Sequence, residues 1–309
     1  GVDGATSVFA IDLDGDDDVD VLSTAYVGET VKYHENDGGS YFFSGTDLTA
    51  TATGASSVFS IDLDGDSFPE ILSASKGDDH VALYEMTTAG ELATYMEISA
   101  SLDVYDPVSV SAHDMDGDAY LDVLAAAYDS MEVVCFHGSP SGTYTSSSVT
   151  TGNGPRAVYT MDPTGSGDGL VAVAFEEDDT VSYCTHQGDW YCELISNAAP
   201  DAYSVVGADL DGDGDVDVVA ATADGLVRYV NDGSNIFDES YISYDTAAGM
   251  KSVYVVDVDG DSDVDVVTAE YDADTVAYYA NDDNAGWGMQ TIIDSSTTNP
   301  INVFCTDVD

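Results

Sequence analysis

Five short segments of this chain carry four acidic residues at the same spacing, a pattern that could hold a metal ion. If the first Asp is counted as position 1, positions 1, 3 and 5 are Asp in every segment, and position 9 is Asp in four of them and Glu70 in one. Two carboxylates forced to about 4 Å repel by about 4 kcal/mol at an effective dielectric near 20. A bound cation would compensate this repulsion. The segments are loop 1 (12–20), loop 2 (62–70), loop 3 (114–122), loop 5 (209–217) and loop 6 (257–265).

The spacing is typical of a calcium loop. A tight turn lets the carboxylates at positions 1, 3, 5 and 9 and the carbonyl of position 7 converge, and calcium takes six to eight such oxygen ligands. Position 4 is always Gly, which gives conformational freedom where the chain bends. The predicted ligands are Asp12, Asp14, Asp16, Asp18 and Asp20; Asp62, Asp64, Asp66, Phe68 and Glu70; Asp114, Asp116, Asp118, Tyr120 and Asp122; Asp209, Asp211, Asp213, Asp215 and Asp217; and Asp257, Asp259, Asp261, Asp263 and Asp265.

Other readings of these loops fit less well. An EF-hand loop has Gly at position 6 and Glu at position 12. In these five loops the shared Gly is at position 4, and neither EF-hand position carries its typical residue throughout. No Cys or His recurs in the loops, which argues against a transition-metal site. Positions 6 and 7 vary, so the carboxylates of Asp17 and Asp18 are interpreted as solvated. Solvated acidic turns without any metal remain the alternative.

The loops belong to a longer repeat. They start 47 to 52 residues apart if a degenerate copy, loop 4 (162–170), and a cut copy at Asp307 are included. Loop 4 has Thr164, Ser166 and Leu170 at positions 3, 5 and 9, so it is predicted to be empty or weak. Valine lies four residues before each start, and a small residue follows twelve residues after the first six, namely Thr24, Ala74, Ala126, Ala174, Ala221 and Ala269. This period indicates a solenoid, propeller or array.

The residues around each loop favour β-strands. Runs of Val, Ile, Tyr and Phe are broken by turns such as Asn-Asp-Gly at 36–38, and no stretch has a sustained helical period. We therefore predict an all-β fold, a propeller of four-stranded blades with six complete repeats and the start of a seventh. An open array of small β modules is the alternative. The prediction is one domain, 1–309, with repeats at about 1–50, 51–101, 102–150, 151–198, 199–246 and 247–296 and a partial repeat at 297–309.

Composition excludes several partners. Sixty acidic residues oppose five basic ones, a formal charge of −55, so nucleic acid and anionic membrane surfaces are not expected partners. No apolar run approaches 20 residues, so no direct membrane insertion is expected. Five calcium ions would leave a charge of about −45, which favours a saline or marine extracellular or cell-surface setting, with a salt-accumulating cytoplasm as the alternative. The missing initiator Met and signal peptide and the cut seventh copy indicate a piece of a longer chain.

Four cysteines are too few for a disulfide scaffold. Cys184 and Cys192 flank a predicted hairpin and could lie at bridging distance. A disulfide and two free thiols both remain open. Cys135 and Cys305 have no local partner.

Taken together, these motifs resemble a known family. Asp-x-Asp-Gly-Asp-x-x-x-Asp, with a Val-rich strand before it, Asp-Val-Leu-x-Ala after it and Tyr-x-Asn-Asp-Gly downstream, resembles the FG-GAP/VCBS repeat of integrin α-subunit propellers. The resemblance implies a propeller, usually seven-bladed, with calcium on the loop that joins the first and second strands of a blade.

The function expected from this sequence is a calcium-binding extracellular propeller that acts as a structural, adhesion or protein-interaction module, including within a surface filament or matrix. Its partner would be a protein or glycan on a propeller face, or further copies of itself. A lectin-like propeller is the alternative, and a polysaccharide lyase is less favoured. The five His (His34, His80, His113, His137 and His186) share no motif, and so few basic residues would hold an acidic polymer poorly. No enzyme activity is expected.

Overall fold

The computed structural model describes residues 3–39, 45–49, 52–87, 92–99, 104–161, 169–234, 236–282 and 286–306. The chain divides into two compact units, Gly1–Ser148 with Thr306–Asp309, and Val149–Cys305. Across the described ranges the regular structure is β-strand without helix, so the all-β prediction is confirmed. It follows that no helix among those residues could cross a bilayer. The single domain spanning 1–309 stays a prediction.

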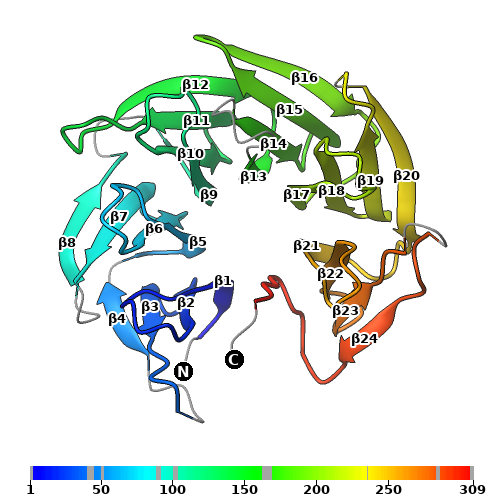
Figure 1. Ribbon diagram of the computed structural model, residues 1–309, viewed down its shortest axis with the longest axis horizontal. Helices are drawn as coiled ribbons and strands as arrows, with labels where there is room; N and C mark the ends of the chain where they lie inside the picture. Colours follow the sequence, from blue (N-terminus) through cyan, green and yellow to red (C-terminus); the bar gives the residue numbers. More distant parts are fainter. Residues whose placement is uncertain are drawn as a thin grey trace. The chain divides into compact units, whose positions relative to one another are not determined.

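The first unit is built from three four-stranded sheets, which we call blades 1 to 3. In each sheet the strands lie side by side in chain order (Figure 1). The last strand of blade 3 crosses the boundary between the units. The strands are β1 (Ala5–Ile11), β2 (Asp20–Ala25), β3 (Thr30–His34) and β4 (Thr46–Thr49); β5 (Ala55–Ile61), β6 (Glu70–Ser75), β7 (His80–Met86) and β8 (Leu92–Glu97); and β9 (Pro107–His113), β10 (Asp122–Ala127), β11 (Glu132–His137) and β12 (Thr145–Thr151).

The second unit contains blades 4 to 6 with the same strand order. Its strands are β13 (Pro155–Met161), β14 (Leu170–Phe175), β15 (Thr180–His186) and β16 (Trp190–Ser196); β17 (Ser204–Ala208), β18 (Asp217–Thr222), β19 (Gly225–Asn231) and β20 (Phe237–Tyr244); and β21 (Met250–Val256), β22 (Asp265–Glu270), β23 (Thr275–Tyr279) and β24 (Thr291–Asp294). The described chain thus forms six four-stranded propeller blades, as the repeat predicted.

The acidic loops join the first and second strands of their blades. In blade 1 the antiparallel register pairs Ile11 with Asp20, and in blade 2 it pairs Ile61 with Glu70. Position 9 of each loop is therefore the first residue of the second strand. This register fixes the loop at both ends, because the residue before position 1 and the residue at position 9 pair with each other in the same ladder.

The core of each unit lies between successive blades. The small residue twelve positions after each loop start lies in the second strand and is fully buried in all six blades, as Thr24, Ala74, Ala126, Ala174, Ala221 and Ala269. Between blades 2 and 3, Leu72 and Val81 pack with Val110 and Val123. Small side chains in the second strand let neighbouring sheets approach closely, so burial of apolar surface between blades stabilises the fold.

The recurring valine has a backbone role. The N–H of Val58 in blade 2 donates to Ser7 Oγ of blade 1 at 3.3 Å. The same hydrogen bond joins Val253 of blade 6 to Ser204 of blade 5 at 3.3 Å. In these two pairs of blades, the valine four residues before the loop thus donates a backbone hydrogen bond that ties its first strand to the preceding blade.

The start of a seventh blade at 297–309 is not supported. Val303 N–H donates to Ser252 Oγ at 3.2 Å, which repeats the contact made by a first strand. Residues 297–306 nevertheless form no strand, because one such contact does not replace the ladder of hydrogen bonds that defines a strand. Residues 307–309, where the cut acidic copy begins, lie outside the described residues.

Of the two alternatives for Cys184 and Cys192, the structure has the disulfide. The two residues face each other on β15 and β16, with their Cα atoms 4.1 Å apart. Cys135 is buried and Cys305 is partly buried, and both are free thiols.

Candidate metal centres

Carboxylates from separate positions of the acidic loops come together. In loops 1, 3 and 5 one oxygen each from positions 1, 3 and 9 lie within 4.8 Å of one another. In loop 2 the close group is Asp62, Asp64 and Asp66, from positions 1, 3 and 5, and does not include Glu70. The groups in the other three loops are Asp12, Asp14 and Asp20; Asp114, Asp116 and Asp122; and Asp209, Asp211 and Asp217.

Position 9 is buried and held by backbone amides. Asp20 is 0% exposed, and its carboxylate accepts hydrogen bonds from Leu13 N–H at 3.0 Å and Asn36 N–H at 2.8 Å. Three other loops repeat both bonds, with Met115 and Gly138 on Asp122, Leu210 and Asn231 on Asp217, and Val258 and Asn281 on Asp265. Position 9 therefore joins its loop to the end of the third strand, in addition to facing any bound ion.

The other acids are oriented by the loop's own backbone. Asp12 accepts hydrogen bonds from Gly15 N–H at 2.8 Å and Asp17 N–H at 3.0 Å. Asp16 accepts one from Asp18 N–H at 3.0 Å. The corresponding N–H of position 7 donates to position 5 in the other loops, from Phe68, Tyr120, Asp215 and Asp263. The carbonyl of position 7 as a ligand stays a prediction.

Two residues in each loop adopt the left-handed conformation. Gly at position 4 has φ between 75° and 81° in all five loops, as the sequence predicted. Position 6 is also left-handed, at Asp17 (71°), Ser67 (77°), Ala119 (71°), Gly214 (92°) and Ser262 (80°). Because the residue type at position 6 varies, this backbone role was not predicted from the sequence. Only Gly214 carries a residue type that signals it.

Burial and crowding of the carboxylates make their charge costly. The pKa of Asp20 and of Asp217 is raised to about 6, and that of Glu70 to about 7, first by burial and against the effect of their backbone hydrogen bonds. The pKa of Asp14 is raised by burial and then by the charges of Asp16, Asp12 and Glu35. A bound cation would reverse this penalty.

Loop 1 also contains an unpartnered oxygen. Oδ1 of Asp14 is buried and has no hydrogen-bond partner among the described residues. Buried polar atoms are usually hydrogen-bonded, so an exception points to an unseen ion or water. The donor set around it consists of carboxylate oxygens, which suit a hard divalent cation such as calcium. The residues of loop 1 therefore fit the ion that the spacing predicts.

Loop 4 differs from the others. Its residues 162–168, with Thr164 and Ser166, lie outside the described residues. Leu170, at position 9, is described and lies buried at the start of β14, packed in the cluster between blades 4 and 5. An apolar side chain thus occupies the place of the buried carboxylate, and a weak or empty loop 4 stays a prediction.

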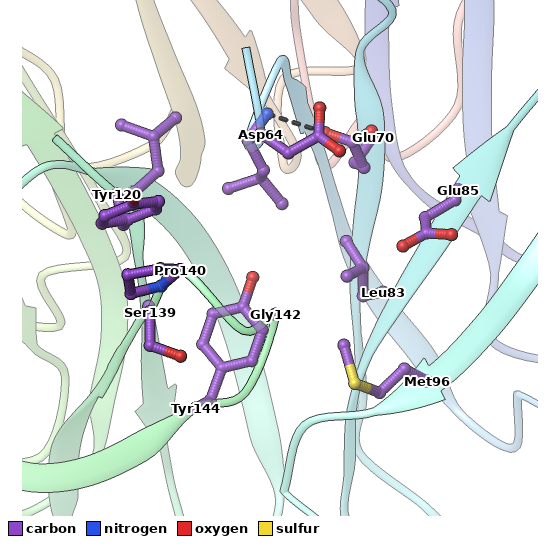
Figure 2. Close-up of a pocket in the computed structure, with 13 residues that line it drawn as sticks. Asp64, Glu70, Leu83, Glu85, Met96, Tyr120, Ser139, Pro140, Gly142 and Tyr144 are labelled. Carbon is purple, nitrogen blue, oxygen red and sulfur yellow. Dashed lines mark hydrogen bonds between the residues drawn. The ribbon is translucent and has the colours of Figure 1, made fainter. Parts of the chain in front are cut away.

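The first unit also has a pocket lined by residues of blades 2 and 3, with a volume of about 240 Å³ (Figure 2). Tyr120 and Tyr144 line it from blade 3, and Leu83, Glu85 and Met96 from blade 2. Asp64 and Glu70 of loop 2 lie at one end of this pocket (Figure 2). The pKa of Tyr144 is raised to about 12, first by burial and then by the negative charge of Glu70. The pocket therefore combines aromatic and acidic groups next to a candidate metal centre.

Two residues beside loop 3 were not recognised from the sequence as site residues. His137 belongs to no sequence motif, and Cys135 has no local partner along the chain. The sulfur of Cys135, one ring nitrogen of His137 and one carboxylate oxygen of Asp122 lie within 4.8 Å of one another. The strand register brings them together, and no motif in the loop signals it.

Solved structures share this fold at low sequence identity. A lectin of Agrocybe aegerita, described as recognising non-reducing terminal N-acetylglucosamine, matches with a TM-score of 0.67 and 16% identity over 95% of this chain and 81% of that chain. A 6-phosphogluconolactonase candidate from Bacteroides uniformis matches with a TM-score of 0.62 and 14% identity over 96% and 86% of the two chains. Virginiamycin B lyase from Staphylococcus aureus matches with a TM-score of 0.62 and 12% identity over 95% and 86%. These identities show a common fold alone.

Sequence comparison is more specific. No curated protein matches the chain significantly. The model of the FG-GAP-like repeat matches residues 12–73, 62–125 and 209–268, which together cover 174 of the 309 residues. The matched segments contain loops 1, 2, 3, 5 and 6, each between the first and second strands of its blade. The chain therefore belongs to the family of FG-GAP-like repeat proteins.

Proposed function

We propose that this protein is a calcium-binding β-propeller whose ions hold the blades in shape. The observation that carries the proposal is the buried, unpartnered Oδ1 of Asp14 among the carboxylates of loop 1. When bound, calcium would supply positive charge and accept oxygen ligands from positions 1, 3, 5, 7 and 9. The chain's own backbone amides orient the carboxylates of each loop through hydrogen bonds.

The ions have a structural role in this proposal. Position 9 connects its loop to the third strand through hydrogen bonds such as Asn231 N–H to Asp217 at 2.7 Å. Neutralising the loop removes repulsion where the first two strands join. The loop also occurs five times, whereas a catalytic centre is expected once. We therefore propose that the protein is not an enzyme.

The setting proposed is extracellular or at the cell surface, in saline water. A formal charge of −55 repels the chain from itself, and dissolved salt screens this repulsion. Such a propeller would act as a structural, adhesion or protein-interaction module, and would present its faces to a protein or glycan partner or to further copies in a filament or matrix.

Calcium titration by calorimetry, combined with thermal unfolding, tests the metal sites. We expect about five ions per chain and a melting temperature that falls by several degrees in EDTA. Asp14→Asn should remove one ion. Asp17→Asn is the matched control, because it makes the same charge change in the same loop at a position without a ligand role. Absence of calcium binding, or equal loss of binding in the two variants, would contradict the proposal.

A glycan-binding role is the second candidate, and the pocket of blades 2 and 3 favours it. Sugar sites often use aromatic platforms together with polar groups, and Tyr120, Tyr144 and Glu85 all line this cavity. A lectin also shares the fold. A glycan array should then show binding that Tyr144→Ala abolishes. Tyr244→Ala, which changes an exposed tyrosine elsewhere, should leave binding unchanged, and an array without hits would remove this candidate.

A further inference from the structure

Blade 3 places a thiol and an imidazole beside its acidic loop. Cys135 and His137 lie two residues apart on β11, so their side chains share one face of the sheet. Cys135 Sγ lies 3.8 Å from His137 Nδ1. The same nitrogen lies 3.5 Å from Asp122 Oδ2 and 3.8 Å from Asp116 Oδ2. One sulfur and two carboxylate oxygens thus lie within 3.8 Å of His137 Nδ1.

These separations suit a tetrahedral metal ion. A zinc ion lies about 2.3 Å from sulfur and about 2.0 Å from nitrogen or oxygen, which places the ligand atoms roughly 3.3–3.6 Å apart. As hydrogen bonds, 3.5 and 3.8 Å exceed the usual range of about 2.7–3.2 Å for an N–H donor to oxygen. We propose that blade 3 binds a transition-metal ion of the zinc and cobalt class through Cys135, His137, Asp122 and Asp116.

The far side of the imidazole supports this assignment. His137 Nε2 lies 2.8 Å from Ser147 Oγ on β12. When Nε2 carries the proton and donates it to Ser147, Nδ1 presents its lone pair to the metal. Metal-bound histidines are commonly oriented by a hydrogen bond of this kind on the other nitrogen.

Sulfur distinguishes this centre from the other described loops. In blade 1, Tyr33 takes the place of Cys135, because it pairs with Leu22 as Cys135 pairs with Leu124. Of the four cysteines, Cys184 and Cys192 are bridged. A thiolate favours transition metals over calcium, and on binding the thiol releases its proton to solvent.

The transition metal replaces calcium in loop 3, because both ions need Asp122 and Asp116. The inference therefore adds to the proposed calcium function in one blade and leaves loops 1, 2, 5 and 6 unchanged. Asp116 is partly exposed, with 30% of its side-chain surface accessible, whereas Asp122 is buried at 1%. The ion therefore enters from the loop side.

Cobalt titration of the full chain in excess calcium tests the proposal. We expect one equivalent of Co²⁺ to bind with a thiolate-to-cobalt absorption band, and Zn²⁺ to abolish the band by displacement. Cys135→Ser and Cys135→Ala should both remove the band, whereas Cys305→Ser, the matched control for the other free thiol, should keep it. His137→Asn should weaken cobalt binding at least 10-fold, and His34→Asn should not.

The outcomes separate this inference from the calcium proposal. Circular dichroism confirms folding of each variant, and calcium binding to the remaining loops is counted in Cys135→Ser. No thiolate band in the folded wild type, or a band that persists in Cys135→Ser, would overturn the transition-metal site even with calcium binding intact. A Cys135-dependent band without calcium binding elsewhere would instead contradict the calcium proposal and leave this one standing.

Discussion

Ser57 Oγ in blade 2 accepts a hydrogen bond of 3.3 Å from the backbone N–H of Val110 in blade 3. Val110 is one of the valines that precede each acidic loop by four residues. The bond therefore links two repeats at equivalent positions of their first strands. Its energy is modest, but it satisfies a partly buried donor at the contact between two sheets.

Ser57→Ala should destabilise the protein by about 1 kcal/mol, because Val110 N–H would lose its side-chain acceptor. Blade 4 provides the reciprocal test, since it has Ala157 where the other five blades have Ser. Ala157→Ser should be neutral or stabilising by a few tenths of a kcal/mol, on the order of a new exposed hydrogen bond. Denaturant unfolding of both variants checks the pair, and equal destabilisation by both would refute the proposed link.

Replacing position 9 should have a different effect from replacing position 3. Asp217→Asn should destabilise even the calcium-free protein by about 1–3 kcal/mol, because an amide group would face two backbone N–H donors. Asp211→Asn should leave calcium-free stability nearly unchanged and lower only the stabilisation by calcium. Unfolding with and without calcium separates the two effects. If Asp217→Asn lost stability only when calcium was present, position 9 would be a ligand and nothing more.

Calcium-free protein should become more stable as pH falls from about 7.5 to about 5.5. The folded-state pKa values of Asp20 and Asp217 are about 6 and that of Glu70 about 7, above their ordinary values of 3.8, 3.8 and 4.5. The folded state therefore binds protons more tightly than the unfolded state, and stability is lost as pH rises through these values. Chemical unfolding after calcium removal measures this change.

Calcium-saturated protein should respond in the opposite direction. Protons compete with calcium for the same carboxylates, so the stabilisation by calcium should shrink over the same pH interval. Glu70→Gln isolates one group, because the variant should lose part of the pH dependence of the calcium-free protein. A pH dependence identical to that of the wild type would show that the carboxylate of Glu70 does not contribute.

Met131→Asn should stabilise the protein by about 0.5–1 kcal/mol. Met131 is 50% exposed and has φ of 57° at the turn between β10 and β11. A left-handed backbone is costly for most side chains, and Asn and Asp tolerate it best. Equivalent turns carry Asp79, Asp179 and Asp274 with similar φ. Thermal unfolding checks the gain, and Met131→Val, a β-branched control, should destabilise instead.

Much of this protein could be predicted from local sequence. The acids at positions 1, 3, 5 and 9 and the Gly at position 4 act within nine residues, so their spacing determines which oxygens can meet. The repeat period and the small residue after each loop predicted four-stranded blades, because each blade needs the same strand pattern and the same small residue for close sheet packing. Both features therefore recur along the sequence at the period of the repeat. The start of a seventh blade, predicted from one valine and a cut motif, is not supported by residues 297–306, since a strand forms only when a neighbour completes its ladder.

The tertiary structure decided what depends on register between strands. Position 9 receives an N–H group from the end of the third strand or just beyond it, such as that of Asn36 on Asp20, 16 residues away. The left-handed backbone at position 6 could not be predicted from residue type, because residues as different as Asp17, Ser67 and Ala119 adopt it. Cys135 and His137 lie against Asp122 only because β11 pairs with β10 in one register. Spacing along the chain specified the loop ligands, and pairing across the sheet determined which other side chains reach them.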